Sequence, residues 1–200
     1  MAHQRQLRLF DAPKRRCMGR PRLHDPGIAH TKRPSVSSKL PLHVTIRMED
    51  AVWNLRSRRS FRIVEKALFA ASARFASVCH FSVQGNHIHL LVEANDKRSL
   101  SSAMRSLGVR VARGMNRLMS RRGRVVAHRY HARALRTPSE VRRARDYVLG
   151  NHAQYARAWR HSTPSRSIDP YSSAAQREMP TPRTWLLRVG WRVASQPPTR

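Results

Sequence analysis

Acidic side chains are scarce in this chain of 200 residues, where 11 Asp and Glu accompany 40 Lys and Arg. The formal net charge of +29 argues against an ordinary small-molecule enzyme. It indicates a polyanionic partner, because each phosphate that a basic side chain neutralises releases counterions. Arginine also dominates lysine, which favours bidentate phosphate contacts and stacking on bases. Nucleic acid is therefore the expected partner.

Cysteine, long apolar runs and nucleotide-binding glycine loops are also missing or rare. The two cysteines, Cys17 and Cys79, are too few for a disulfide framework or a cysteine-based zinc cluster. No stretch has the apolar length of a membrane span, and the basic N-terminus lacks the apolar core of a secretory signal. No glycine-rich phosphate loop precedes a Lys-Ser or Lys-Thr pair. We expect a cytoplasmic, nucleoid-associated protein with no membrane partner.

The composition divides the chain into three segments. Residues 1–41 are basic with little apolar periodicity, so they cannot bury enough surface to offset their ordering entropy. We expect a disordered arm there, which either follows DNA phosphates or has no specific role. Residues 42–160 show regular apolar patterns and form the expected domain. Residues 161–200 form an irregular, proline-containing tail with a short tryptophan-containing helix.

Strand-like and helix-like periodicities alternate within the expected domain. Alternating apolar side chains predict strands over 42–48, 78–83 and 131–136, and a further strand that contains His87 and His89. Apolar steps of three and four predict helices over 60–76 and 99–120. In the strand over 78–83, Cys79, Phe81 and Val83 are expected on one side.

A last helix is announced by Thr137-Pro138-Ser139-Glu140 and is expected to run to about residue 159. The threonine suits the N-cap, the proline the first helical position, and the glutamate closes a capping box. The order of elements predicts an α+β, ferredoxin-like split βαβ fold with an antiparallel sheet. Its helices are expected on one face, with the last helix appended as the catalytic helix. The other face, which displays the histidines, is expected to stay open for ligand.

The segment Gln84-Gly85-Asn86-His87-Ile88-His89 is the most informative part of the sequence. Gly85 and Asn86 suit a hairpin turn. Side chains of a strand alternate, so His87 and His89 share one face while Ile88 can be buried on the other. Two neutral imidazoles on one rigid face can bind a divalent metal. The alternative interpretation is a pair of solvent-facing residues on a half-buried strand.

Tyr147 and Asn151 share one face of the last helix, because they are four residues apart. The two imidazoles and an amide oxygen could bind Mg²⁺ or Mn²⁺ and polarise a phosphodiester. A phenol, with its ordinary pKa of about 10, needs a nearby metal ion or arginine to favour the phenolate. Its attack on phosphorus gives a covalent phosphotyrosine and a free 3′ hydroxyl. The bond energy is retained, so rejoining needs no ATP.

Basic side chains near these residues are candidates for binding nucleic acid. Arginines cluster on a non-apolar face of the helix predicted over 99–120, and others flank the catalytic candidates. The residues that we assign to this role are Arg110, Arg113, Arg117, Arg133 and Arg143.

Three segments resemble motifs of one family. Gly-Asn-His-Ile-His-Leu-Leu-Val at 85–92 resembles the HUH motif of the single-tyrosine transposases. Asp-Tyr-Val-Leu-Gly-Asn at 146–151 is similar to the Tyr-x-x-x-Asn segment of the REP-associated tyrosine transposases within that group, and Arg-Tyr-His-Ala-Arg at 129–133 also resembles the family. The resemblance covers about residues 42–160. Members often have Asn-Pro where this chain has Asn151-His152.

The resemblance implies a transposase of a mobile element, which binds single-stranded DNA hairpins and cleaves and rejoins DNA with a divalent metal, Mg²⁺ or Mn²⁺. It implies that Tyr147 is the nucleophile. It implies that His87 and His89 are metal ligands, with Asn151 as the third ligand or a partner on the metal side. Tyr130 and Tyr155 are the alternative nucleophiles.

Other functions remain open at this level. A domesticated or inactive relative would bind nucleic acid without cleaving it. A ribosome-associated or RNA-structural protein would explain the charge equally well, although it gives no reason for the paired motifs. A homodimer, in which the tyrosine helix of one copy completes the partner's site, is also compatible with the residues.

Overall fold

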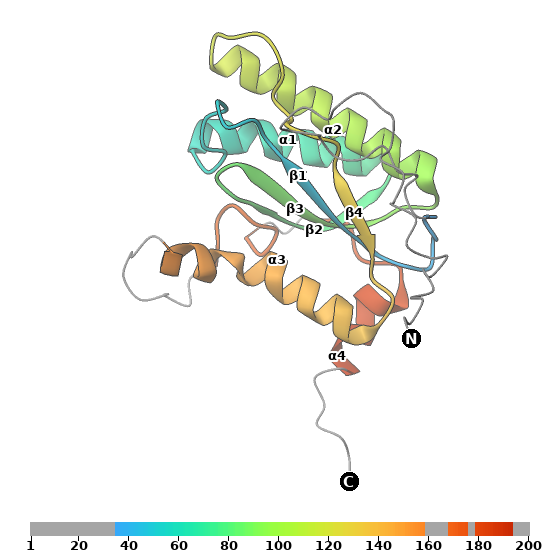
Figure 1. The fold of residues 1–200 in the computed structure, drawn as a ribbon. Helices are drawn as coiled ribbons and strands as arrows, with labels where there is room; N and C mark the ends of the chain where they lie inside the picture. The colour runs from blue at the N-terminus through green and yellow to red at the C-terminus, as the bar shows by residue number, and fades with distance from the viewer. Residues whose placement is uncertain (1–34, 159–167, 176–178, 194–200) are drawn as a thin grey trace, which may run out of the picture. The chain divides into compact units, whose positions relative to one another are not determined.

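The structure is a computed structural model that describes residues 35–158, 168–175 and 179–193, with the backbone alone for residues 151–158. Most of the arm predicted over 1–41 therefore lies outside the described residues. The elements follow one another in the order shown in Figure 1. They are β1 (Leu42–Arg47), α1 (Arg58–Arg74), β2 (Ser77–Val83), β3 (His87–Glu93), α2 (Lys97–Leu118), β4 (His131–Ala134), α3 (Pro138–Ala158), η1 (Leu186–Gly190) and α4 (Trp191–Val193).

The four strands form one antiparallel sheet in the order β2-β3-β1-β4. Helix α1 connects β1 to β2, and β3 lies between these two strands in the sheet. Helix α2 connects β3 to β4, and β1 lies between those two. Two interleaved crossovers of this kind make up the split βαβ arrangement. The predicted α+β fold with an antiparallel sheet is confirmed.

Each face of the sheet has its own core, because strand side chains alternate. Ile88, Leu90 and their neighbours on β1 pack against α1 and α2, which lie together on one face as predicted. Helix α3 packs on the opposite face, where Val141 and Val148 contact Leu91. The expectation that this second face stays open for ligand is wrong, since the apolar stripe of α3 needs the same sheet surface.

A β-bulge in β2 changes which side chains reach each core. Val78 pairs with Val92 and His80 pairs with Leu91, so Cys79 is the extra residue between them. Cys79 consequently joins the core under α3, whereas Phe81 and Val83 join the core under α1 and α2. The prediction that these three share one side is wrong for this reason. Burial raises the pKa of the Cys79 thiol to about 12, which makes it a poor nucleophile.

The predicted N-terminus of α3 is confirmed. Oγ1 of Thr137 accepts a hydrogen bond from the backbone N–H of Glu140 over 3.2 Å, and the Glu140 carboxylate accepts from the backbone N–H of Thr137 over 3.3 Å. This reciprocal pair fixes where the helix leaves β4 and therefore how its turns meet the sheet. None of the helices in the described part of the chain has the length and apolar character needed to cross a bilayer.

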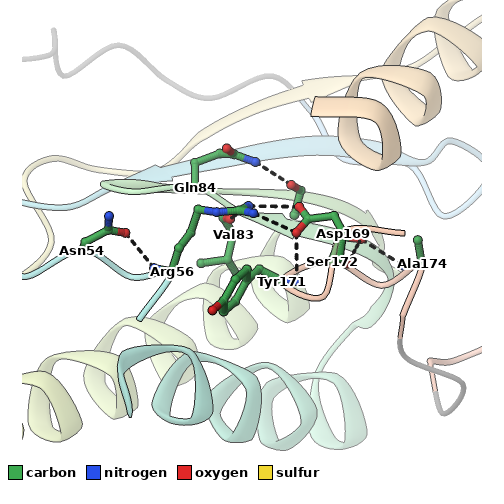
Figure 2. Close-up of polar contacts among 9 residues, drawn as sticks. Asn54, Arg56, Val83, Gln84, Asp169, Tyr171, Ser172 and Ala174 are labelled. Carbon is green, nitrogen blue, oxygen red and sulfur yellow. Dashed lines mark hydrogen bonds and ion pairs between the residues drawn. The ribbon is translucent and has the colours of Figure 1, made fainter. Parts of the chain in front are cut away.

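Residues 169–173 lie along the outer edge of β2. The backbone N–H of Val83 donates to the carbonyl of Tyr171 over 2.9 Å, and that of Ser173 donates to the carbonyl of Phe81 over 2.9 Å. Figure 2 shows the guanidinium of Arg56, from the loop before α1, meeting the Asp169 carboxylate beside this edge. Their two hydrogen bonds measure 2.9 and 3.0 Å, and only 1% of the Asp169 side chain is exposed.

A second buried acid holds the segment that precedes η1. Glu93, at the end of β3, is 2% exposed. Its carboxylate accepts hydrogen bonds from the backbone N–H of Arg183 over 2.8 Å and of Thr184 over 2.9 Å, and from the Thr184 hydroxyl over 2.7 Å. Leu186 and Leu187 then enter the core under α3. The later part of the chain is thus anchored to the domain at two separate acids.

Candidate functional site

A row of polar side chains crosses the sheet on the α3 face. His89 of β3 lies opposite Thr45 of β1, and Thr45 lies opposite His131 of β4. His87, two residues before His89, shares its face, as predicted. The rings of these two histidines are 4.7 Å apart, centroid to centroid, at 87°. The strands therefore place both imidazoles on one rigid surface, as the alternation of side chains requires.

Neighbouring side chains orient the two imidazoles. Nδ1 of His87 donates to the amide oxygen of Asn86 over 2.8 Å, because an amide oxygen only accepts. Nδ1 of His89 is 3.2 Å from the Thr45 hydroxyl. The Tyr147 hydroxyl lies 3.3 Å from Nε2 of His89, within hydrogen-bond distance. In this arrangement the neutral His87 carries its proton on Nδ1 and leaves Nε2 unprotonated, whereas either tautomer of His89 is compatible with its two hydroxyl contacts.

The electrostatic surroundings keep these rings neutral. Burial, reinforced by His87 and His43, lowers the pKa of His89 to about 3. Burial and the nearby Arg47 also lower the pKa of His87. His43 of β1 packs at 5.5 Å from the His89 ring, and burial, with Arg133 and His131, lowers its pKa to about 4. Neutral imidazole is the form that binds metals.

Tyr147 places a phenol against His89. It lies on α3, one helical turn after the buried Ala144 and beside the buried Val148. Its ring meets that of His89 edge to face, with centroids 4.9 Å apart. Because 37% of Tyr147 is exposed while His89 is 5% exposed, the phenol is the part of this cluster that a large substrate reaches first.

The residues present suit a divalent ion. Asn86 and Thr45 contact the Nδ1 atoms of His87 and His89, as second-shell partners of metal-binding histidines do, and these contacts leave the Nε2 atoms on the other side of each ring. Among the described residues, no three His, Cys, Asp or Glu side chains form a group that could hold a metal. A third protein ligand from the described side chains would therefore be another oxygen donor, such as an amide.

Some of the predicted site residues are brought together and others are not. Arg133 lies opposite His43 in the sheet and pairs with Glu140 of α3 at 3.4 Å, and the exposed Arg143 follows on α3. Arg110, Arg113 and Arg117 are exposed on α2, which packs on the other face of the sheet. Asn151 belongs to α3, but its side chain lies outside the described residues, as does that of Tyr155.

The sequence alone did not reveal two neighbours of the histidines, His43 and Thr45. His43 and Thr45 occupy the alternate positions of a strand whose apolar face was recognised. The pairing of β1 with β3 brings that other face beside the histidines. The alternation of side chains in β1 already put His43 and Thr45 on one face. The strand register was needed to place that face beside the histidines.

One histidine of this face gives a stability prediction. Burial and the nearby Arg145 lower the pKa of His80 to about 4 from its ordinary 6.5. Between these values the unfolded chain takes up a proton that the folded protein does not, so stability falls as the pH drops from about 6.5 toward 4. The loss in free energy of unfolding between pH 7 and pH 5 should be about 1 to 2 kcal/mol smaller in His80→Gln than in the wild type.

Urea unfolding of the wild type and of His80→Gln at both pH values measures this difference. An identical pH dependence in the two proteins would show that His80 titrates normally in the folded state.

Comparisons with known proteins support the fold. A solved structure described as a REP-associated tyrosine transposase bound to a REP hairpin is similar to this chain, with a TM-score of 0.54 and 14% sequence identity. The similarity covers 73% of this chain and 82% of that one. No protein-family model and no curated protein matches the sequence. At this identity the likeness concerns the fold.

Proposed function

We propose that this protein is a transposase that binds single-stranded DNA hairpins, and that it cleaves and rejoins the DNA through a covalent 5′-phosphotyrosine on Tyr147. The observation that carries the proposal is the 3.3 Å contact between the Tyr147 hydroxyl and Nε2 of His89. It brings together two motifs that are 58 residues apart in the chain. The similar structure, a transposase bound to a DNA hairpin, supports the same function.

The residues suggest how the reaction proceeds. The Tyr147 oxygen attacks phosphorus and forms a new P–O bond, while the bond from phosphorus to the 3′ oxygen breaks. The phenolic proton leaves to solvent, which reaches this exposed side chain, and the 3′ oxygen departs as a hydroxyl after taking up a proton. Attack by a 3′ hydroxyl on the phosphotyrosine reverses the steps, so strands are exchanged without ATP.

His87 and His89 would hold Mg²⁺ or Mn²⁺ through Nε2, with Asn151 as the third ligand that the sequence suggests. The bound ion would neutralise charge on the phosphodiester. Arg133 and Arg143 lie on the same side as Tyr147 and are suited to orient the phosphate backbone. Arg110, Arg113 and Arg117 would contact DNA that extends over the α2 side. Every contact of this kind makes binding weaken steeply with salt.

The test is a cleavage assay on hairpin-bearing single-stranded DNA taken from the gene's own flanks. We expect nicking with Mg²⁺ or Mn²⁺, none with EDTA, and a protein–DNA adduct that survives denaturation. The same strand with a scrambled stem serves as the control. Tight hairpin binding without nicking would favour a non-catalytic DNA-binding protein, and a preference for structured RNA would favour an RNA-binding one.

A further inference from the structure

Tyr147 contacts the rings of two histidines. It meets His89 of β3 with ring centroids 4.9 Å apart at 81°, and His43 of β1 with ring centroids 6.1 Å apart at 71°. The two histidine rings themselves lie 5.5 Å apart. Aromatic rings attract one another edge to face over centroid distances of about 4.5 to 7 Å. The sheet therefore offers Tyr147 a surface of two rings, of which only His89 belongs to a recognised motif.

Strand β1 fixes the position of His43. It is an inner strand of the sheet, so His43 has a neighbour on each side, Leu91 of β3 and Arg133 of β4. Leu91 is fully buried and belongs to the core under α3, whereas 37% of Tyr147 is exposed. The His43 ring thus connects the packed part of this face with the exposed phenol.

What His43 supplies to Tyr147 is the surface of its ring. Its Nε2 is buried and, among the described residues, has no hydrogen-bond partner. A contact that does not use this nitrogen depends on the shape of the ring. An apolar ring of similar size should replace it at little cost in stability, because the exchange also removes the unpaired polar atom.

A nucleophile of this kind needs a fixed direction. The phenolic oxygen has to approach phosphorus opposite the departing 3′ oxygen, and a misplacement of about 1 Å can slow an enzymatic step by about 10²-fold. The Tyr147 ring can turn about the bonds of its side chain. Because part of it is exposed, the ring contacts on its buried side have to limit this rotation.

We propose that His43 is a positioning residue, whose ring, together with that of His89, holds the Tyr147 phenol in the direction required for attack on phosphorus, an inference that rests on the proposed function. In this role His43 needs to touch neither DNA nor the reacting atoms. Its loss should therefore change the rate of attack and not the affinity for DNA.

The first test compares two quantities on labelled, hairpin-bearing single-stranded DNA: the rate of adduct formation at saturation and the dissociation constant in EDTA. His43→Ala removes the ring and should slow adduct formation by about 10-fold or more, with an unchanged dissociation constant. His43→Phe restores a ring and should react at close to the wild-type rate. A His43→Phe protein as slow as His43→Ala, or a His43→Ala protein as fast as the wild type, would overturn the proposal.

His80→Ala is the matched control. His80 of β2 lies opposite Leu91 as His43 does from β1, and it is close to Arg145 of α3. Its removal loosens the packing under α3 without removing either ring that contacts Tyr147, so the adduct should form at the wild-type rate. Equal slowing in both alanine variants would show that only the packing of α3 matters, which contradicts a positioning role.

A second test needs no DNA. The ¹³C relaxation of the labelled Tyr147 ring, assigned by comparison with Tyr147→Phe, reports its motion on the nanosecond timescale. We expect greater motion in His43→Ala and wild-type motion in His43→Phe and His80→Ala. Urea unfolding checks that each variant is folded, and His43→Leu, which keeps bulk without a ring, replaces His43→Ala if that variant does not fold.

The two tests separate this role from the function on which it rests. Unchanged ring motion in His43→Ala, with adduct formation intact in the wild type, refutes the role of His43 alone. A wild type that forms no adduct refutes the proposed covalent chemistry and, with it, any part of His43 in the attack.

Discussion

Tyr147→Phe is expected to abolish covalent capture of DNA by this protein while leaving hairpin binding nearly unchanged. The substitution removes only the phenolic oxygen, which lies 3.3 Å from Nε2 of His89, and keeps the ring that packs against His89. Loss of a nucleophile lowers the rate by roughly 10³-fold or more. The measurement is the yield of denaturation-resistant adduct on labelled hairpin DNA, with the dissociation constant determined in parallel.

Tyr130→Phe is the matched control, because Tyr130 is another candidate nucleophile on a different surface. Its ring packs against the core under α1 and α2, and its hydroxyl lies 3.3 Å from Oγ of Ser101 in α2. This variant should form the adduct at the wild-type rate. An adduct that persists in Tyr147→Phe would keep the covalent chemistry but move the nucleophile, with Tyr155 to be tested next.

Asp169→Ala is expected to destabilise the protein by about 3 to 5 kcal/mol. The substitution leaves the Arg56 guanidinium, whose side chain is 12% exposed, without the carboxylate that it meets through two hydrogen bonds. It also removes the acceptor of the Tyr171 backbone N–H, which lies 3.0 Å from the carboxylate. The free energy of unfolding, measured by urea titration, should fall accordingly.

The ion pair of Arg47 with Asp50 provides the comparison. Its atoms are 3.5 Å apart, and 60% and 85% of the two side chains are exposed. Water and salt screen such a pair, so Asp50→Ala should change the free energy of unfolding by less than about 1 kcal/mol. Equal effects of the two substitutions would show that burial does not strengthen the Arg56–Asp169 interaction.

Local patterns predicted most of the fold, because they act over a few residues. The alternation in β1 and β3 and the three- and four-residue steps in α1 and α2 each select one apolar face. The capping box at Thr137 and Glu140 sets the start of α3 from a single turn of chain. Interactions of this range are visible in the sequence without knowledge of the partners.

Features that depend on register were not predictable in the same way. The bulge at Cys79 reverses its face relative to Phe81, yet the sequence of β2 alone fits uninterrupted alternation. Helix α3 covers the histidine face because the apolar side chains on that face of the sheet also need a packing partner. The pairing of β1 with β3 brings His43 and Thr45 to the site.

For the candidate site, spacing predicted that His87 and His89 share a face, and the structure adds that Tyr147 contacts His89 from α3. The roles of Tyr147 and of Asn151 stay predictions. Asp169 is 113 residues from Arg56, too far for any local pattern to relate them.

That separation has a consequence for synthesis on the ribosome. Arg56 emerges from the exit tunnel well before Asp169, and at about 5 to 20 residues per second the wait is roughly 6 to 23 s. During this time the nascent sheet carries an exposed edge along β2, and the Arg56 guanidinium beside it does not yet have the Asp169 carboxylate. A messenger RNA truncated after the codon for Tyr147 would release a chain that stays in this state. Chaperones and proteases would act on such a chain.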